Sequence, residues 1–250
     1  MKRLWIPVLL LILQSLHAQE VGLQFEQANQ YYRTGDYQKA IDLYEQVIKN
    51  GYQNPALYYN LGNAYFKVND IPSAILFFER AKRLAPGDDD ISYNLRLANL
   101  RVVDKIEPVP QIVFIRWWNS IGQSLSSDGW AVFSIICVWC LMGAGLCFFL
   151  FRSLVVQRLS LLAVLIVVVL LVFGIFSMYG QYRAEHSDTN AIIFSPTVSV
   201  KSAPDDKSTD LFVVHEGVKV ELLDIVGDWR KIRLVDGKVG WLGVQTIKII

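Results

Sequence analysis

Aromatic and small residues recur in the first part of this chain at a constant spacing of 34 positions. The recurring pairs are Tyr31 and Tyr65, Ala40 and Ala74, and Tyr44 and Phe78. A repeat of this length forms one supersecondary unit, which cannot bury its apolar face alone and therefore stacks on further copies. The period predicts a stacked array of helices at the N-terminal end of the chain.

The second copy resembles the tetratricopeptide repeat (TPR) pattern, because it carries the small and aromatic residues of that pattern in the right order. These signature positions are Tyr58, Leu61, Gly62, Tyr65, Ala74, Phe78, Ala81 and Pro86. We predict an all-α TPR solenoid over residues 20–101, made of two helix pairs and a half-repeat that covers the last apolar face. The predicted helices are Phe25–Thr34, Tyr37–Lys49, Ala56–Val68, Pro72–Leu84 and Ile91–Leu100.

The first helix of each TPR pair lines a concave groove, which is the usual binding surface of a repeat array. Asparagine amides there can pair with both the N–H and the C=O groups of an extended peptide, and Arg33 and Lys67 can receive a carboxylate. The predicted partner-binding residues are Phe25, Asn29, Tyr32, Arg33, Tyr59, Asn60, Asn63, Phe66, Lys67, Tyr93 and Asn94. On this interpretation, alanine at Asn60 and Asn94 weakens partner capture without unfolding the repeats. The alternative is that these side chains only solvate the groove or hold the chain's own linker.

The N-terminal residues have the form of a targeting segment. Lys2 and Arg3 precede an apolar run that ends at Leu16, and His17-Ala18 completes a cleavage site. We therefore predict a signal peptide over residues 1–18, with an uncleaved N-terminal anchor as the alternative.

Two long uncharged segments, residues 130–151 and 159–179, carry much of the hydrophobic content of the chain, which is 53%. At about 1.5 Å per residue, each is long enough to cross a hydrocarbon core of ~30 Å as a transmembrane helix. The connecting segment 152–158 contains Arg152 and Arg158 and no acid, so the positive-inside rule places it in the cytoplasm. The sequence thus predicts a multi-pass protein of a bacterial inner membrane, with both terminal domains in the periplasm.

Residues 102–129 link the repeats to the first span. Apolar side chains in this linker fall on one helical face, at Phe114, Trp117, Trp118, Ile121 and Leu125. Aromatic-rich amphipathic helices beside a span tend to lie in the headgroup region, so we predict an interfacial segment. Packing of this segment on the TPR helices is the alternative.

After Tyr179 the pattern changes to short apolar runs separated by Gly, Pro, Asp and Ser, which predicts five short strands. We expect a small all-β barrel over residues 188–250. The order of Pro204, Gly217, Gly227-Asp228-Trp229, Asp236-Gly237 and Gly240-Trp241 resembles a bacterial SH3 (SH3b) domain. Trp229 and Trp241 are either ligand contacts of this domain or part of its core, and Lys231 and Arg233 face solvent.

The order of these segments resembles the Bacteroides aerotolerance (Bat) family, as do Arg116-Trp117-Trp118 and Ser127-Asp128-Gly129-Trp130 before the first span. The resemblance implies membership of a membrane assembly with von Willebrand A-domain proteins and a MoxR-type ATPase. It also implies a link to tolerance of oxygen or oxidative stress. We therefore expect a multi-domain membrane scaffold that binds partner proteins, with a peptidoglycan-binding anchor acting through the SH3b domain as the alternative.

The sequence carries no recognisable catalytic or metal-binding motif. The histidines lack metal-ligand spacing, and hydrolase motifs and phosphate loops are missing, so we expect no enzyme activity, no metal and no cofactor. Cys137 and Cys140 form a Cys-x-x-Cys pair, but they lie in predicted hydrocarbon, where a thiol does not ionise readily. A redox enzyme that uses this pair is the third hypothesis, and the position of the pair in hydrocarbon argues against it. A net charge of +1 does not favour nucleic acid as a partner.

Overall fold

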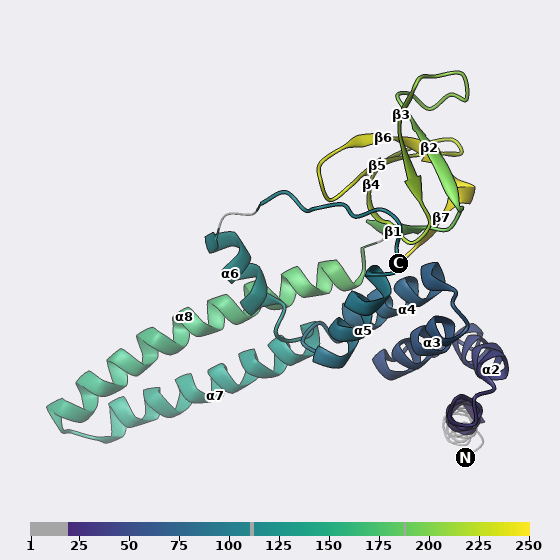
Figure 1. Cartoon of the computed structure of the whole chain (residues 1–250). Helices are drawn as coiled ribbons and strands as arrows, with labels where there is room; N and C mark the ends of the chain where they lie inside the picture. The colour runs from purple at the N-terminus through teal and green to yellow at the C-terminus, as the bar shows by residue number, and fades with distance from the viewer. Residues whose placement is uncertain (1–19, 111–112, 188) are drawn as a thin grey trace, which may run out of the picture. The chain divides into compact units, whose positions relative to one another are not determined.

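The computed structural model describes residues 20–110, 113–187 and 189–250, which form two compact units (Figure 1). The repeat–sheet unit contains the N-terminal helices as far as residue 82, residues 88–109 and the C-terminal sheet. The hairpin unit contains residues 83–87 and the segment from residue 110 to residue 187. The predicted signal peptide, residues 1–18, lies outside the described residues.

The N-terminal part consists of paired helices whose bounds follow the 34-residue period. Residues 20–33 are helical, and the helices that follow are α2 (Tyr37–Lys49), α3 (Pro55–Lys67), α4 (Ile71–Leu84) and α5 (Asp89–Asn99). From α2 to α5, each helix begins and ends within two residues of its prediction. The N-terminal helical pairs of the predicted solenoid are therefore present.

The turn inside each pair repeats in backbone detail. Gly35 and Asn69 occupy equivalent positions and both have positive φ, 84° and 65°. The next residue donates its N–H to a tyrosine carbonyl in each copy, Asp36 to Tyr31 and Asp70 to Tyr65, both at 3.0 Å. This left-handed residue ends the first helix and reverses the chain, so the second helix packs back on the first.

The C-terminal part is a seven-stranded antiparallel sheet. Its strands are β1 (Asn190–Ile193), β2 (Thr197–Lys201), β3 (Asp210–His215), β4 (Lys219–Val226), β5 (Trp229–Arg233), β6 (Val239–Gly243) and β7 (Ile247–Ile249), in the order β3-β2-β6-β5-β4-β1-β7. The sequence predicts five strands, and two differences explain the discrepancy. Pro196 lacks an N–H and separates β1 from β2, and β7 is too short to show alternation.

The last TPR helices and the sheet share one hydrophobic core. Buried side chains of α4, of α5 and of Val102, three residues after α5, meet those of the sheet in a single cluster. Its members include Ala74, Ile75, Leu95, Ala98 and Val102 on the helical side and Ile192, Ile193, Val218, Val220 and Ile247 on the sheet side. The sequence predicts residues 20–101 and 188–250 as separate domains, whereas the structure places them in one unit. The sheet therefore covers the apolar end that a short repeat array leaves open.

Polar contacts surround this shared core. Glu79 on α4 forms an ion pair with Lys219 at 2.8 Å. The carboxylate of Asp104 accepts the backbone N–H of His215 at 2.7 Å and lies 2.9 Å from its Nδ1. Arg80 donates to the carbonyl of Ile249 on the edge strand β7 at 2.8 Å. These contacts satisfy polar groups at the rim and fix how the helices and the sheet meet.

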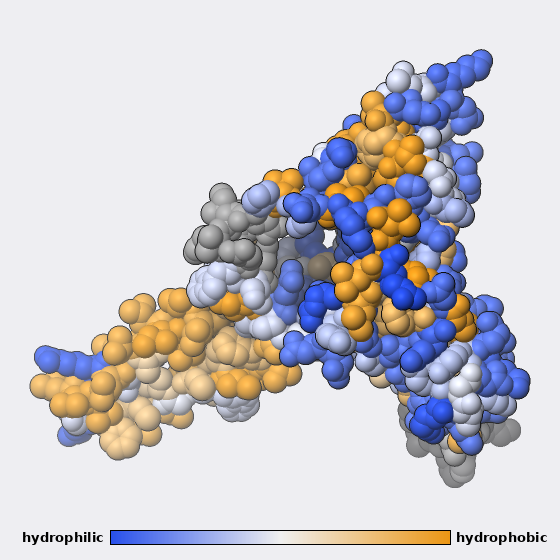
Figure 2. All heavy atoms as spheres, viewed as in Figure 1, coloured by the Kyte–Doolittle hydropathy of each residue, from blue (hydrophilic) through white to orange (hydrophobic). Residues whose placement is uncertain are grey.

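The hairpin unit consists of α6 (Val113–Gly122) and two long apolar helices, α7 (Ser127–Leu150) and α8 (Leu154–Glu185). Both long helices are long and apolar enough to cross a membrane, and most of their large side chains are exposed. Figure 2 shows this hydrophobic surface along the pair. The predicted loop 152–158 is shorter in the structure, since α8 already begins at Leu154. The reason is that residues 154–158 contain no Gly or Pro to interrupt a helix.

The short helix α6 packs on α8. The ring of Trp118 meets Phe173 edge-on, with centroids 5.0 Å apart. The carbonyl of Gly122, at the end of α6, accepts hydrogen bonds from Trp130 Nε1 at 2.9 Å and from Gln181 Nε2 at 3.0 Å. The predicted amphipathic segment is therefore helical and contacts the apolar pair, and its place at a membrane surface stays a prediction.

Gly217 provides a test of the shared core. Its φ is +86°, and an added Cβ would lie 2.9 Å from Cγ2 of Val102. We expect Gly217→Ala to lower the free energy of unfolding of the repeat–sheet unit by about 2–4 kcal/mol, because backbone strain and overpacking add. Urea unfolding of the full chain in detergent, followed by circular dichroism, measures this loss.

Gly227 is the matched control, since its φ is +54° but an added Cβ would meet no atom within 4 Å. Gly227→Ala carries the backbone strain alone and should lower the free energy of unfolding by about 1–2 kcal/mol. Equal losses in the two variants would contradict a packed interface at Gly217.

Candidate functional site

A cavity of about 300 Å³ lies among the first helices of the repeats. It is lined by Tyr32, Tyr59, Asn63, Phe66, Lys67, Phe78, Asn94 and Leu97. The sequence predicts six of these residues as groove contacts, because the 34-residue period places them on one side of successive helices. It misses Phe78 and Leu97. Phe78 is a core position of α4, and no signal in the sequence marks its edge as part of a cavity wall.

Pairs of asparagine side chains link neighbouring repeats across the groove. Asn60 Nδ2 donates to Asn29 Oδ1 at 2.9 Å, and Asn94 Nδ2 donates to Asn63 Oδ1 at 2.8 Å. The two bonds are equivalent, because both donor and acceptor recur after 34 residues. Each bond therefore holds the first helix of one repeat against the first helix of the next.

Tyrosine hydroxyl groups extend these asparagine pairs. Tyr44 donates to Asn29 Oδ1 at 2.7 Å, and Asn94 Nδ2 also donates to the hydroxyl of Tyr59 at 2.9 Å. Burial raises the pKa of Tyr44, so its hydroxyl remains a hydrogen-bond donor well above neutral pH. Part of the amide capacity expected for a bound peptide is thus used between the repeats.

Some hydrogen-bonding capacity in the groove is still open. Among the described residues, Asn63 Nδ2 and Asn94 Oδ1 have no partner, so one donor and one acceptor remain available in the cavity wall. The pKa of Tyr32 is raised by burial and, to a smaller extent, by the neighbouring Tyr37 and Tyr59. The Tyr32 hydroxyl is therefore protonated at neutral pH and can donate.

The groove carries positive charge at its rim. Lys67 lines the cavity, and Arg33, the exposed residue at the equivalent position of the first repeat, does not. Neither forms an ion pair in the part of the chain that the structure describes. Arg101 lies with its guanidinium 5.9 Å from the ring centroid of Phe66, a cavity residue, and donates to Asn69. An unpaired cation beside aromatic walls is suited to a carboxylate on an extended chain.

The other predicted groove residues do not line the cavity. Asn29 and Asn60 belong to the asparagine pairs. Phe25 packs against Tyr44, with ring centroids 5.9 Å apart. Tyr93 is 55% exposed on α5, beside Arg96.

Trp229 and Trp241 lie on the outer face of the sheet. In the β5–β6 register, Lys231 is opposite Trp241 and Ile232 is opposite Gly240. Ile232 and Leu242 are buried, so the residues that alternate with them point away from the core. Both indoles are half-buried, and Lys231 Nζ lies 5.8 Å from the ring centroid of Trp241. The structure therefore places neither tryptophan among the fully buried core residues.

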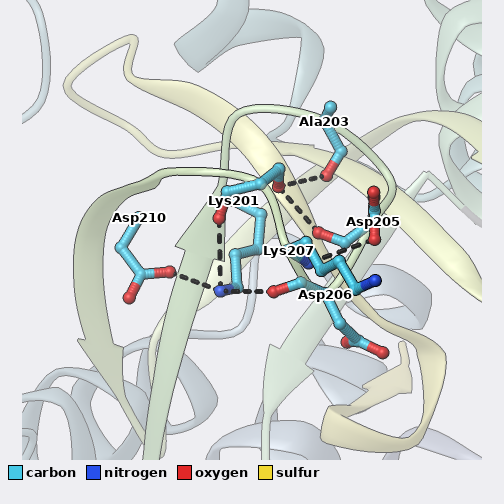
Figure 3. Close-up of polar contacts among 7 residues, drawn as sticks. Lys201, Ala203, Asp205, Asp206, Lys207 and Asp210 are labelled. Atoms are coloured by element: carbon cyan, nitrogen blue, oxygen red, sulfur yellow. Dashed lines mark hydrogen bonds and ion pairs between the residues drawn. The ribbon is translucent and has the colours of Figure 1, made fainter.

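In the β2–β6 pairing, Lys201 on β2 is opposite Trp241. Its side chain contacts the loop that follows β2. Its ammonium pairs with Asp210 Oδ1 at 2.7 Å and donates to the carbonyls of Asp206 at 3.1 Å and Ser208 at 3.4 Å (Figure 3). These contacts hold the loop between β2 and β3 in one conformation. Lys231 therefore contacts an indole on this face, whereas the ammonium of Lys201 is held by the loop.

No metal-binding group emerges where the structure describes the chain: His, Cys, Asp and Glu nowhere gather in threes with suitable geometry. Cys137 is buried and Cys140 is exposed on α7, and both are free thiols.

A comparison with protein families identifies repeats in the N-terminal helices. The tetratricopeptide repeat family model matches residues 25–89, which is less than half of the chain. No curated protein is similar enough to match the chain. Residues 25–89 are therefore a TPR region, and TPR repeats suggest interaction with other proteins.

The asparagine pairs change what alanine substitutions in the groove should do. Asn60→Ala together with Asn94→Ala removes three hydrogen bonds between the repeats. We expect this double variant to lose stability, by about 1 kcal/mol for each bond, instead of leaving the repeats intact. Thermal unfolding of the full chain, followed by circular dichroism, measures the loss. Gln53→Ala, in the exposed loop before α3, is the control and should leave the melting temperature unchanged.

Proposed function

We propose that this chain is a non-enzymatic, membrane-anchored scaffold whose TPR groove binds an extended segment of a partner protein. The observation that carries the proposal is the cavity of about 300 Å³ with aromatic walls and Lys67 at its edge. Such a cavity offers rigid contact area to a side chain and a cation to an acid, but no group that would transform a substrate.

The bound segment carries a carboxylate, either from an acidic side chain or from a C-terminus. Lys67 and Arg33 lack an acidic partner within the described residues, so a carboxylate of the ligand can form an ion pair with either side chain. The open donor of Asn63 and the open acceptor of Asn94 suit the N–H and C=O groups of an extended backbone.

The apolar pair α7 and α8 anchors the scaffold as a transmembrane hairpin in a bacterial inner membrane. Arg152 and Arg158 favour a cytoplasmic position for the turn between them, which puts the TPR groove and the sheet in the periplasm. Anchoring raises the effective concentration of the groove for partners in the same membrane, so contacts of modest affinity add up to a stable complex.

The order of segments supports a finer assignment. We propose a BatE-like member of the Bat family, in which von Willebrand A-domain proteins are the partners and a MoxR-type ATPase belongs to the assembly. The role of this assembly is tolerance of oxygen or oxidative stress. The C-terminal sheet is the SH3b-like module of this arrangement.

A peptidoglycan-binding anchor is the second candidate. It is favoured by the outward-facing Trp229 and Trp241 with Lys231 between them, because indole faces and a cation suit sugars and carboxylates of the cell wall. This candidate requires that the purified full chain sediments with isolated wall and that alanine at both tryptophans abolishes sedimentation. The scaffold requires neither result.

Charge reversal at the groove tests the proposed scaffold. Lys67→Glu combined with Arg33→Glu repels a carboxylate, and we expect the yield of crosslinked partner to fall about tenfold, which corresponds to 1.4 kcal/mol of binding free energy. In-cell crosslinking followed by mass spectrometry measures the yield.

Lys49→Glu is the matched control, because Lys49 is exposed at the end of α2, which is the second helix of its pair. This variant should crosslink like the wild type. If the groove variant also keeps its partners while folding normally, the groove is not the binding surface.

A further inference from the structure

A crevice of about 290 Å³ lies between α6 and the C-terminal part of α8 in the hairpin unit. Its walls include Trp118 and Gln123 on the α6 side and Phe176, Gly180, Gln181 and Ala184 on the α8 side. The crevice stays open because α8 presents small residues there. An added Cβ at Gly180 would meet no atom within 4 Å.

The walls of the crevice are held in place by specific contacts. Trp118 is fixed edge-on against Phe173 and Phe176, with centroid distances of 5.0 Å and 6.3 Å. The carbonyl of Gly122 accepts from both Trp130 and Gln181, which ties the end of α6 to both long helices. These contacts fix the position of α6 on the two long helices and so define the walls of the crevice.

Polarity changes along the crevice. Phe176 lies within the uncharged run that ends at Tyr179, whereas Gln181 and Ala184 follow that run. Two amide side chains, Gln123 and Gln181, line the polar end, and Trp118 and Phe176 line the apolar end. An occupant must therefore be apolar at one end and hydrogen-bonding at the other.

We propose that this crevice binds one membrane phospholipid, with an acyl chain against Trp118 and Phe176 and the headgroup region at Gln123 and Gln181. The crevice is continuous with the exposed apolar surface of α8, so acyl chains are the surrounding solvent if α7 and α8 cross the membrane. Water at the apolar end would lack hydrogen-bond partners. Arg183 belongs to the same turn of α8 as Gln181 but does not line the crevice, since its guanidinium lies 5.8 Å from the ring centroid of Tyr179. The headgroup is therefore assigned to the amides of Gln123 and Gln181. This assignment rests on the proposed membrane anchoring.

Photocrosslinking with a defined lipid tests the assignment. The full chain is reconstituted into vesicles of phosphatidylethanolamine and phosphatidylglycerol that contain a phosphatidylglycerol with a diazirine on its acyl chain. Crosslinked residues are mapped by mass spectrometry. We expect crosslinks to concentrate on residues 118–123 and 176–184, well above the level on other exposed parts of α7 and α8.

Gly180→Leu fills the crevice, and it should lower these crosslinks about tenfold, because the side chain takes the place of the acyl chain. Gly145→Leu is the matched control: Gly145 on α7 likewise has no atom within 4 Å of an added Cβ but lies outside the crevice. This control should leave the crosslinks unchanged.

Crosslinks spread evenly over α7 and α8, or unaffected by Gly180→Leu, would overturn the lipid site while leaving the anchoring intact. The anchoring itself fails separately, if alkaline carbonate extracts the chain from membranes.

Discussion

The apolar end of a short repeat array has to be covered, and the rest of the repeat–sheet unit depends on how this chain covers it. Stacked repeats gain stability from each neighbour, so an array with two pairs and a half-repeat leaves a large fraction of its apolar surface at its ends. Here Ile75, Leu95 and Val102 bury that surface against Ile193 and Val218 of the sheet. The edge strand β7 in turn receives a hydrogen bond from Arg80 of α4 at the carbonyl of Ile249. Each part thus protects a surface that would be exposed in the other alone.

In the proposed scaffold, the side chains that stabilise the groove are also those that face its ligand. Asn29, Asn60, Asn63 and Asn94 hold adjacent repeats together, while only part of their hydrogen-bonding capacity faces the cavity. A ligand therefore meets a wall that is already ordered, which reduces the entropy lost on binding. For the same reason we expect asparagine substitutions to affect folding, and charge changes at Lys67 to act on the proposed binding.

The local parts of the fold could be predicted from the sequence, and the contacts between distant segments could not. The 34-residue period located the TPR helices, and the uncharged runs located α7 and α8. The groove positions followed from the same period, so six residues of the cavity wall were predicted. The ion pair of Glu79 with Lys219 joins residues far apart in the chain, and neither residue has a local pattern that reveals its partner. The bonds between asparagines were likewise missed, because an amide in a groove looks the same whether it binds a peptide or another repeat.

Hydrogen exchange of the full chain in detergent micelles tests most directly whether the helices and the sheet form one unit. If they share a core, the slowest amides of α4 and of β1 should exchange through the same global opening, with equal free energies and an equal response to added urea. If α4 keeps its protection while β1 opens at a clearly lower free energy, the sheet is an independent domain. The shared core, and the covering role assigned to the sheet, would then be wrong.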